Sequence, residues 1–269
     1  MNDVLLTCKN IEVSFDGFKA VDGVDLELRR GEVHFLIGPN GAGKTTLVDA
    51  ITGLAKYTGS VTKDGEELRG KKIPHIARKG IGRTFQTATV FENLTVAQNL
   101  DIAAGAGRSP WSLLRRRKHL PQQVLETMER IGLADHAGTD AGILAHGQKQ
   151  WLEIGMLLVG DADVLLLDEP IAGMGHEERE TTGKLLHDIA ADRAVAVVEH
   201  DMDFMRANAS RVTVLHAGAV LAAGSVDEVS TDAKVQEVYL GTSNAAPSET
   251  APSKGAPSKD METADARVA

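Results

Sequence analysis

The chain has 269 residues, of which 42% are hydrophobic and 25% charged, and its formal net charge is −9. This composition is typical of a soluble globular protein, and the acidic balance argues against nucleic acid as the main partner. A single cysteine (Cys8), the absence of a signal-peptide pattern and the absence of an apolar run of roughly 18 residues predict a cytosolic protein, whose membrane role would come through a partner.

The first part of the chain, to about residue 81, is predicted to mix strands and turns. Residues 5–15 and 24–28 are predicted strands, which Asp22-Gly23 separates. A short strand at 59–62 leads into Lys63-Asp64-Gly65, a hairpin-type turn. These segments predict an antiparallel β region at the N-terminus.

Within this region, a strand at 33–37 and a helix from 47 flank a phosphate-binding pattern, G-x-x-x-x-G-K-[ST]. Its glycines let backbone N–H groups form an anion-binding nest, and the helix N-terminus adds its dipole. Lys44 is expected to reach the β- and γ-phosphates of a nucleotide, and Thr45 to offer a hydroxyl to Mg²⁺. The alternative is a glycine-rich turn without a ligand. The candidate nucleotide-binding residues are Gly38, Asn40, Gly41, Gly43, Lys44, Thr45 and Thr46.

The middle of the chain is predicted to be helical. Thr95-Val96-Ala97-Gln98 fits a capping box that opens a helix through Ala104. After a basic run at 115–118, Pro121 starts a second helix and Gly132 stops it. A third runs from about 148 to 159. The residues expected on the buried faces are Val124, Leu125, Met128 and Ile131 of the second helix, and Trp151, Ile154 and Leu158 of the third.

Two apolar strands follow, at 164–167 and 194–198, and both end in acidic clusters. Continuous apolar strands alternating with helices indicate a largely parallel sheet, which binds ligands beyond the carboxyl ends of its strands. Asp168 could hold Mg²⁺ and Glu169 could deprotonate the attacking water, whereas the alternative is a solvated strand end. His200 could donate to the γ-phosphate or be structural. The other histidines, such as His34, show no metal-ligand spacing.

With these residues in place, the chain resembles an ABC-transporter ATPase subunit over residues 1 to about 242. Residues 38–46 match the phosphate loop, Asp168 the magnesium aspartate, Glu169 the catalytic base and His200 the switch histidine. Phe15 stands where an aromatic residue stacks on adenine, and Gln86 at the lid glutamine, which implies a catalytic role and a magnesium contact. Leu144-Ala145-His146-Gly147-Gln148 stands at the signature, usually Leu-Ser-Gly-Gly-Gln.

The resemblance implies an α/β fold of the ABC-type P-loop ATPase, with a mostly parallel core sheet, the N-terminal antiparallel β region and an inserted helical subdomain at about 87–160. The ATPase domain would span 1–242. Residues 243–269, rich in Ala, Pro and Ser, are predicted to be a disordered tail.

Three positions depart from the family pattern. Ala145 replaces the signature serine, whose hydroxyl would meet the γ-phosphate of ATP on a partner subunit, so a weaker contact is expected. His146 replaces a glycine. Gly175 stands where many relatives carry an aspartate that crosses the dimer interface. Communication between two ATP sites would therefore be altered.

Other segments resemble the branched-chain amino acid and urea importer group. These are Arg83-Thr84-Phe85-Gln86, Asn93-Leu94-Thr95-Val96 and Val238-Tyr239-Leu240-Gly241. The segments 146–156 and 172–174 look most like the first ATPase subunit of urea importers. The resemblance therefore implies a subunit that drives import of urea or a short amide, with branched-chain amino acids as the alternative cargo.

The implied cofactors are ATP and Mg²⁺. The implied partners are a second ATPase subunit, related or identical, that forms a nucleotide-sandwich dimer, two membrane-spanning permease subunits and, indirectly, a substrate-binding protein; no nucleic acid is expected. The location would be peripheral, on the cytoplasmic face of the plasma membrane, with permease helices docking near Val90, Phe91 and Leu94.

Two other interpretations remain open. One is a soluble ABC ATPase without a transport role. The other is lipid export, in which Lys79, Arg83 and the basic run at 115–118 would contact anionic headgroups.

Overall fold

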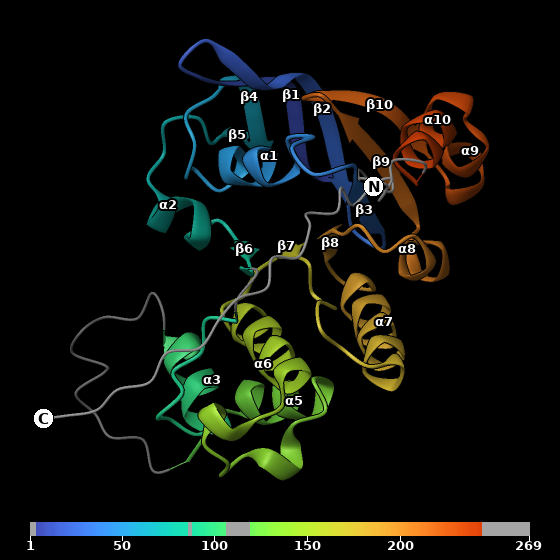
Figure 1. Ribbon diagram of the computed structural model, residues 1–269. Helices are drawn as coiled ribbons and strands as arrows, with labels where there is room; N and C mark the ends of the chain where they lie inside the picture. The colour runs from blue at the N-terminus through green and yellow to red at the C-terminus, as the bar shows by residue number, and fades with distance from the viewer. Residues whose placement is uncertain (1–3, 86–87, 106–118, 244–269) are drawn as a thin grey trace, which may run out of the picture.

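Two β-sheets organise the computed structural model, which describes residues 4–85, 88–105 and 119–243 (Figure 1). The strands are β1 (Val4–Phe15), β2 (Phe18–Arg29), β3 (Val33–Ile37), β4 (Thr58–Lys63), β5 (Glu66–Glu67), β6 (Ile81–Arg83), β7 (Val164–Asp168), β8 (Ala194–Val198), β9 (Arg211–His216) and β10 (Ala219–Gly224). The helices are α1 (Lys44–Ile51), α2 (Ile73–Arg78), α3 (Val96–Gly105), α5 (Gln122–Arg130), α6 (His146–Val159), α7 (His176–Ala190), α8 (Met202–Asn208), α9 (Val226–Thr231) and α10 (Ala233–Ser243).

The larger sheet has the strand order β10-β9-β3-β8-β7-β6 and the smaller sheet β2-β1-β4-β5. From β9 to β6 the strands of the larger sheet pair in parallel, and β10 pairs with β9 antiparallel. All pairs in the smaller sheet are antiparallel. The predicted fold class, a mostly parallel core sheet beside an N-terminal antiparallel region, is confirmed.

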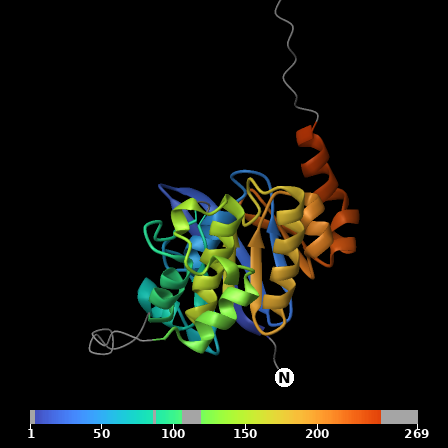
Figure 2. The same ribbon diagram turned by 90° about the horizontal axis from the view of Figure 1, so that it is seen from below.

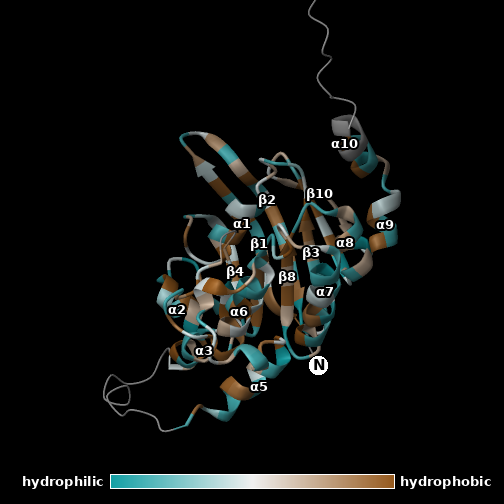
Figure 3. Cartoon of the chain, turned by 60° about the horizontal axis from the view of Figure 1, so that its bottom comes forward, coloured by the Kyte–Doolittle hydropathy of each residue, from teal (hydrophilic) through white to brown (hydrophobic). Residues whose placement is uncertain are grey.

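The central strands are almost entirely apolar because both faces of the larger sheet are covered. On β3, Val33, Phe35 and Ile37 share an apolar cluster with residues of α6, α7 and α8. Leu36, between them, belongs to a second cluster with α1 and the antiparallel sheet. Side chains alternate along a strand, so a strand covered on both faces needs apolar residues throughout. In Figure 3, the hydrophobic colour (brown) covers most of β8, whereas α7 also carries hydrophilic residues (teal).

The N-terminal hairpin turns earlier than predicted. β1 and β2 join through Asp16 and Gly17, with φ of 46° and 88°, as both central residues of a type I′ turn require. Asp22 and Gly23 lie inside β2, in a stretch where the pairing register shifts. The prediction was wrong because the two Asp-Gly pairs carry the same local turn signal. The later hairpin is confirmed, since β4 and β5 pair antiparallel around Asp64-Gly65.

The three predicted helices of the middle region, α3, α5 and α6, are present and pack on one another, with α7 beside α6 in Figures 1 and 2. The capping box of α3 forms, because the Thr95 N–H donates to Gln98 Oε1 over 2.9 Å and the Gln98 N–H to Thr95 Oγ1 over 3.2 Å. Leu125 was wrongly placed on the buried face of α5, since 39% of its surface is exposed. It directly follows the buried Val124, and adjacent helical residues do not share a face. On α6, Ile154 and Leu158 are buried and Trp151 is half-buried.

Three predictions fall outside the described residues: the lid glutamine Gln86, the basic run at 115–118 and the tail from residue 244 onward. The boundaries proposed for the helical subdomain and for the tail stay predictions. Within the described ranges, no helix combines the length and the apolar character that a membrane span needs.

Candidate nucleotide site

The phosphate-binding loop connects β3 to α1, at the carboxyl end of a central parallel strand. Residues 40–46 line a cavity of about 340 Å³ together with Phe15, Phe18, Ala20, Glu169 and Val198. A helix N-terminus offers unpaired backbone N–H groups and a positive dipole end, which attract anions. The predicted loop residues from Asn40 onward and Glu169, far apart in the sequence, therefore meet in one cavity. Gly38, Asp168 and His200 are not among its described lining residues.

Two glycines of the loop are required by space as well as by conformation. Gly38 and Gly43 have φ of 155° and 100°. A Cβ atom would lie 2.2 Å from the carbonyl oxygen of Leu215 at Gly38, and 2.4 Å from that of Ala20 at Gly43. Both clashes are with backbone, which cannot turn aside as a side chain can. Glycine is therefore needed at these two positions, where the backbone of the loop lies against the backbone of β9 and of β2.

The ammonium group of Lys44 lies over its own loop. Its Nζ donates to the carbonyl oxygens of Gly38 and Pro39, over 2.7 and 3.1 Å. Partial burial lowers the pKa of Lys44, and the charges of Glu169 and Asp168 oppose this shift. An ammonium group held by the loop carbonyls, within the field of two carboxylates, has the position needed to bind phosphate oxygens.

Asp168 ends β7 and is almost fully buried beside Arg83 of β6. Arg83 Nη2 lies 3.2 Å from Asp168 Oδ2, and Nη1 pairs with Asp49 of α1. Burial raises the pKa of Asp168, and the ion pair with Arg83 opposes that rise. The side chain of Arg83 is only 7% exposed. Two acidic residues from other elements therefore hold Arg83 inside the fold, and little of its side chain is left to contact solvent or lipid headgroups.

The candidate ligands fit a magnesium ion, which prefers hard oxygen donors. Asp168, at the end of β7, offers a carboxylate, and Thr45, in the first turn of α1, offers a hydroxyl. Among the described residues, no group of three or more His, Cys, Asp and Glu side chains could hold a metal by itself. A magnesium ion here would depend on phosphate and water oxygens for its remaining ligands.

Glu169 has a backbone conformation that residues other than glycine rarely adopt, with φ of 48°. Its N–H donates to the Val198 carbonyl oxygen of β8 over 2.9 Å. Its side chain is 26% exposed, and Oε1 lies 3.7 Å from Nδ1 of His200, which is 66% exposed. Left-handed backbone at a non-glycine residue persists where surrounding structure enforces it, often at functional sites. The structure thus brings the predicted base and His200 together.

Glu199 directly follows β8 and precedes His200. The sequence indicated only that it belongs to an acidic cluster at a strand end. It is 2% exposed and accepts hydrogen bonds from the N–H groups of Ile171, over 3.4 Å, and His200, over 3.1 Å. Burial raises its pKa. Glu199 therefore connects the end of β8 to the segment that follows Glu169.

The aromatic wall of the cavity has two residues instead of the one predicted. Phe15 and Phe18 face each other across the Asp16-Gly17 turn, and they are 54% and 69% exposed. Exposed aromatic rings beside a phosphate loop can stack on a base. Phe18 was missed because the turn was placed later in the chain.

The signature segment begins α6 and, as far as the described residues show, lines no part of this cavity. The Ala145 N–H donates to Gln148 Oε1 over 3.0 Å. The alanine side chain cannot accept from the first N–H groups of α6, as a serine N-cap would. Ala145 and His146 are exposed and Gly147 is buried.

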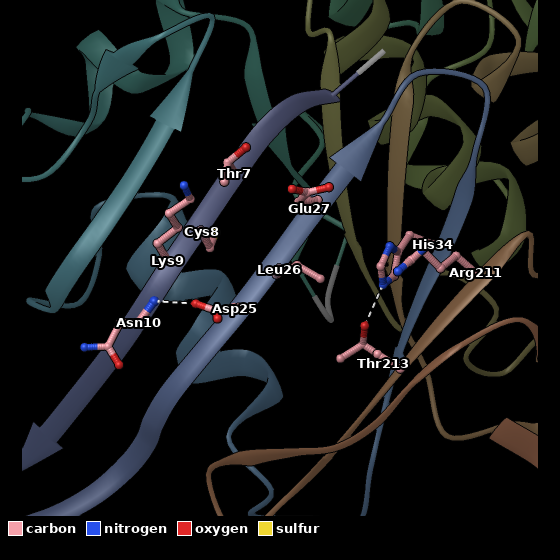
Figure 4. Close-up of a pocket in the computed structure, with 11 residues that line it drawn as sticks. Thr7, Cys8, Lys9, Asn10, Asp25, Leu26, Glu27, His34, Arg211 and Thr213 are labelled. Atoms are coloured by element: carbon pink, nitrogen blue, oxygen red, sulfur yellow. Dashed lines mark hydrogen bonds between the residues drawn. The ribbon is translucent and has the colours of Figure 1, made fainter. Parts of the chain in front are cut away.

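A larger cavity, of about 490 Å³, lies at the other end of β3 (Figure 4). It holds none of the predicted nucleotide-binding residues. On its wall, His34 Nε2 lies 2.8 Å from Thr213 Oγ1, and burial lowers the pKa of His34 to about 4. A buried, neutral histidine bonded to a threonine fits the structural role that the sequence indicates for His34.

Glu153 on α6 is a buried acid that the sequence analysis did not single out. It is 5% exposed, and its Oε1 accepts from the Thr89 N–H over 3.3 Å, whereas its Oε2 has no hydrogen-bond partner among the described residues. Burial raises the pKa of Glu153 from its ordinary 4.5 to about 7. The folded protein therefore holds this carboxyl in an environment that disfavours its charge.

Glu153→Gln should stabilise the protein more at pH 8 than at pH 5. A carboxyl whose pKa is raised by folding contributes stability below its unfolded pKa, and this is lost as pH rises through the folded pKa. The shift of Glu153 corresponds to roughly 3 kcal/mol at pH 8, a destabilisation that a neutral amide avoids. Thermal unfolding at both pH values measures the effect, with Glu126→Gln on exposed α5 surface as control. An effect of equal size at both pH values would contradict the explanation.

Comparisons with known proteins agree on one family. A family model described as ABC transporter matches residues 21–172. The high-affinity branched-chain amino acid transport ATP-binding proteins BraF of Pseudomonas aeruginosa and LivG of Escherichia coli are 33% and 34% identical over 254 residues, covering 90% of this chain and 99% of each relative. A crystal structure of an ATP-binding cassette of an ABC transporter, in its ADP conformation, matches with a TM-score of 0.76 and 32% identity, covering 88% of this chain and 99% of that one.

Proposed function

The chain belongs to the ABC transporter ATP-binding family and is an ATPase of that family, and on this premise we propose that it is the ATP-hydrolysing subunit of an importer. The observation that carries the proposal is the meeting of the phosphate loop and Glu169 in one cavity, at the carboxyl ends of strands of the parallel sheet. The names of the relatives, which are transport proteins, favour this over a soluble ATPase without a transport role.

We propose a role for each candidate residue, and that of Gln86, which lies outside the described residues, rests on resemblance alone. Lys44 and the loop N–H groups bind the β- and γ-phosphates, and Phe15, with Phe18 opposite, stacks on adenine. Glu169 accepts the proton of a water molecule that attacks the γ-phosphorus, while the bond to the β–γ bridging oxygen breaks. His200 donates to a γ-phosphate oxygen. Thr45, Asp168 and Gln86 would hold a magnesium ion, which supplies charge neutralisation on the phosphates.

We propose that function needs a second ATPase subunit, either a related chain or a second copy. This chain has one phosphate loop and one signature, and Ala145 to Gln148 lie outside the cavity of their own loop. In a sandwich dimer they would contact ATP held by the partner. Without a hydroxyl at Ala145 or a carboxylate at Gly175, these contacts are weaker than the family pattern provides.

Two membrane-spanning permeases and, through them, a substrate-binding protein complete the proposed importer, on the cytoplasmic face of the plasma membrane. The proposed permease contact lies at Val90, Phe91 and Leu94. Phe91 is 51% exposed, while Val90 and Leu94 are half-buried. Phe91 is therefore the residue of the three with the most surface to offer to a partner.

Two cargo classes are candidates, each with its own observation. The names of BraF and LivG favour branched-chain amino acids. The segments 146–156 and 172–174, which resemble urea importers, favour urea or a short amide. In the proposed importer neither of these two segments contacts cargo. Their resemblance to urea importers would instead indicate which ATPase subunit pairs with this chain, and through that subunit which transporter it serves.

Uptake measurements separate these candidates. Cells that lack this chain should lose high-affinity uptake of its cargo, because the permease no longer has its motor. Labelled leucine and labelled urea are supplied at low concentration, where passive entry is slow. Loss of leucine uptake alone assigns the amino acid branch, and loss of urea uptake alone the urea branch. Unchanged uptake of both would contradict both cargo assignments.

A further inference from the structure

Arg179, on the first turn of α7, joins the two segments that follow the candidate catalytic residues. Its Nε donates to the Met174 carbonyl oxygen over 3.1 Å, and its Nη1 donates to Asp201 Oδ2 over 2.6 Å. Met174 lies in the loop that continues from Glu169, and Asp201 directly follows His200. One side chain therefore connects the segments that follow two neighbouring strands, β7 and β8.

The Asp201 end of this connection is fixed in place. Asp201 Oδ1 accepts from the Phe204 N–H over 2.9 Å and caps α8. The Phe204 ring packs against Phe35 of β3, with centroids 5.9 Å apart. A Cβ atom at Gly183 would lie 2.3 Å from Asn208 Oδ1, so α7 and α8 approach closely at the other end of α8. Arg179 thus pairs with a rigid part of the fold.

The loop at the other end combines apolar packing with few described polar links. Ile171 and Met174 are buried in the apolar cluster that also holds Val197 of β8 and Phe204 of α8. After Glu169, whose N–H is bonded to Val198, the described hydrogen-bonded links of the loop to β8 and α8 are the 3.4 Å bond from Ile171 to Glu199 and the Arg179 bridge. Gly175, at the end of this loop, has no side chain that could add a further contact. Of these links, the Arg179 bridge has the shortest bond and pairs opposite charges.

We propose that Arg179 is a positioning residue that sets Glu169 and His200 at the separation hydrolysis needs, now 3.7 Å between Oε1 and Nδ1. The proposal rests on the roles assigned to Glu169 and His200 under the proposed function. Arg179 is not among the described residues that line the nucleotide cavity, so it acts through Met174 and Asp201. The side chains of Arg179 and Asp201 are 40% and 24% exposed. Such a pair adds little to folding stability, so its loss should change turnover while the fold persists.

Steady-state ATPase kinetics of the full chain test this proposal, with Arg179→Met, Asp201→Asn and the double variant. Asparagine caps a helix as well as aspartate does, so Asp201→Asn removes the charge and keeps the cap. Each single variant should lower kcat about fivefold, or about 1 kcal/mol in barrier height, with the KM for ATP and the melting temperature nearly unchanged. The double variant should fall no further, because both changes break one interaction. Arg179→Lys should recover part of the loss.

The matched control is Arg206→Met on α8, whose pair with Asp203 is long, at 3.8 Å, and exposed; it should leave kcat unchanged. If Arg179→Met keeps kcat within about twofold while Glu169→Gln is inactive, the positioning role is overturned and the proposed function stands. Losses that multiply in the double variant, or a large fall in melting temperature, also overturn the positioning role. If Glu169→Gln and His200→Ala stay active, the roles assigned to these two residues fail instead.

Discussion

Glu169→Gln should bind ATP as tightly as the unaltered protein and hydrolyse it at least about 100-fold more slowly. The amide keeps the shape of the side chain and can accept a hydrogen bond from water, but it is a far poorer base. Glu169 lines the nucleotide cavity in a left-handed backbone conformation that orients its side chain. Phosphate release and ATP binding, measured on the same preparation, separate the two effects.

Glu199→Gln provides the matched control for this prediction. Glu199 lies at the next strand end and accepts from the His200 N–H, but its buried side chain is not among the described residues of the cavity. Its change to glutamine should reduce hydrolysis far less than that of Glu169. Activity of Glu169→Gln above about a tenth of the unaltered protein would contradict the assignment of Glu169 as the base.

The features that the sequence predicted well are those that local patterns encode. The capping box at Thr95 uses residues three apart, and the apolar runs of β7 and β8 follow from burial on both faces of one sheet. The phosphate loop is likewise a continuous segment, so its position between β3 and α1 could be read directly. Local signals failed where two were equivalent, as with the two Asp-Gly pairs of the N-terminal hairpin.

The environment of the candidate site could not be predicted in the same way, because it depends on contacts between distant segments. Arg83 is buried between Asp49 and Asp168, and no periodicity in the sequence links these three residues. The positive φ of Glu169 arises where β7 ends beside β8 and the Glu169 N–H pairs with Val198. The strand-end pattern suggested roles for Glu169 and His200 and resemblance to a family strengthened them, but their separation and the Arg179 bridge required the structure.

Lys44→Ala should lose affinity for ATP as well as activity, which distinguishes it from Glu169→Gln. The ammonium of Lys44 lies over the loop and would pair with the β- and γ-phosphates already in the bound ground state, so its removal weakens binding and hydrolysis together. Losing a hydrogen bond to a charged group costs about 1.5–3 kcal/mol, which is roughly a 10- to 100-fold rise in Kd. Calorimetric titration with ATP and Mg²⁺ measures this rise in Kd, with Lys184→Ala on the exposed face of α7 as control.

The side chain of Lys44 also donates hydrogen bonds to the carbonyl oxygens of Gly38 and Pro39. The melting temperature of the variant is therefore measured first, so that a disordered loop is not mistaken for a lost contact with phosphate. A folded variant that binds ATP with unchanged affinity would show that Lys44 does not hold the phosphates, whatever its effect on turnover.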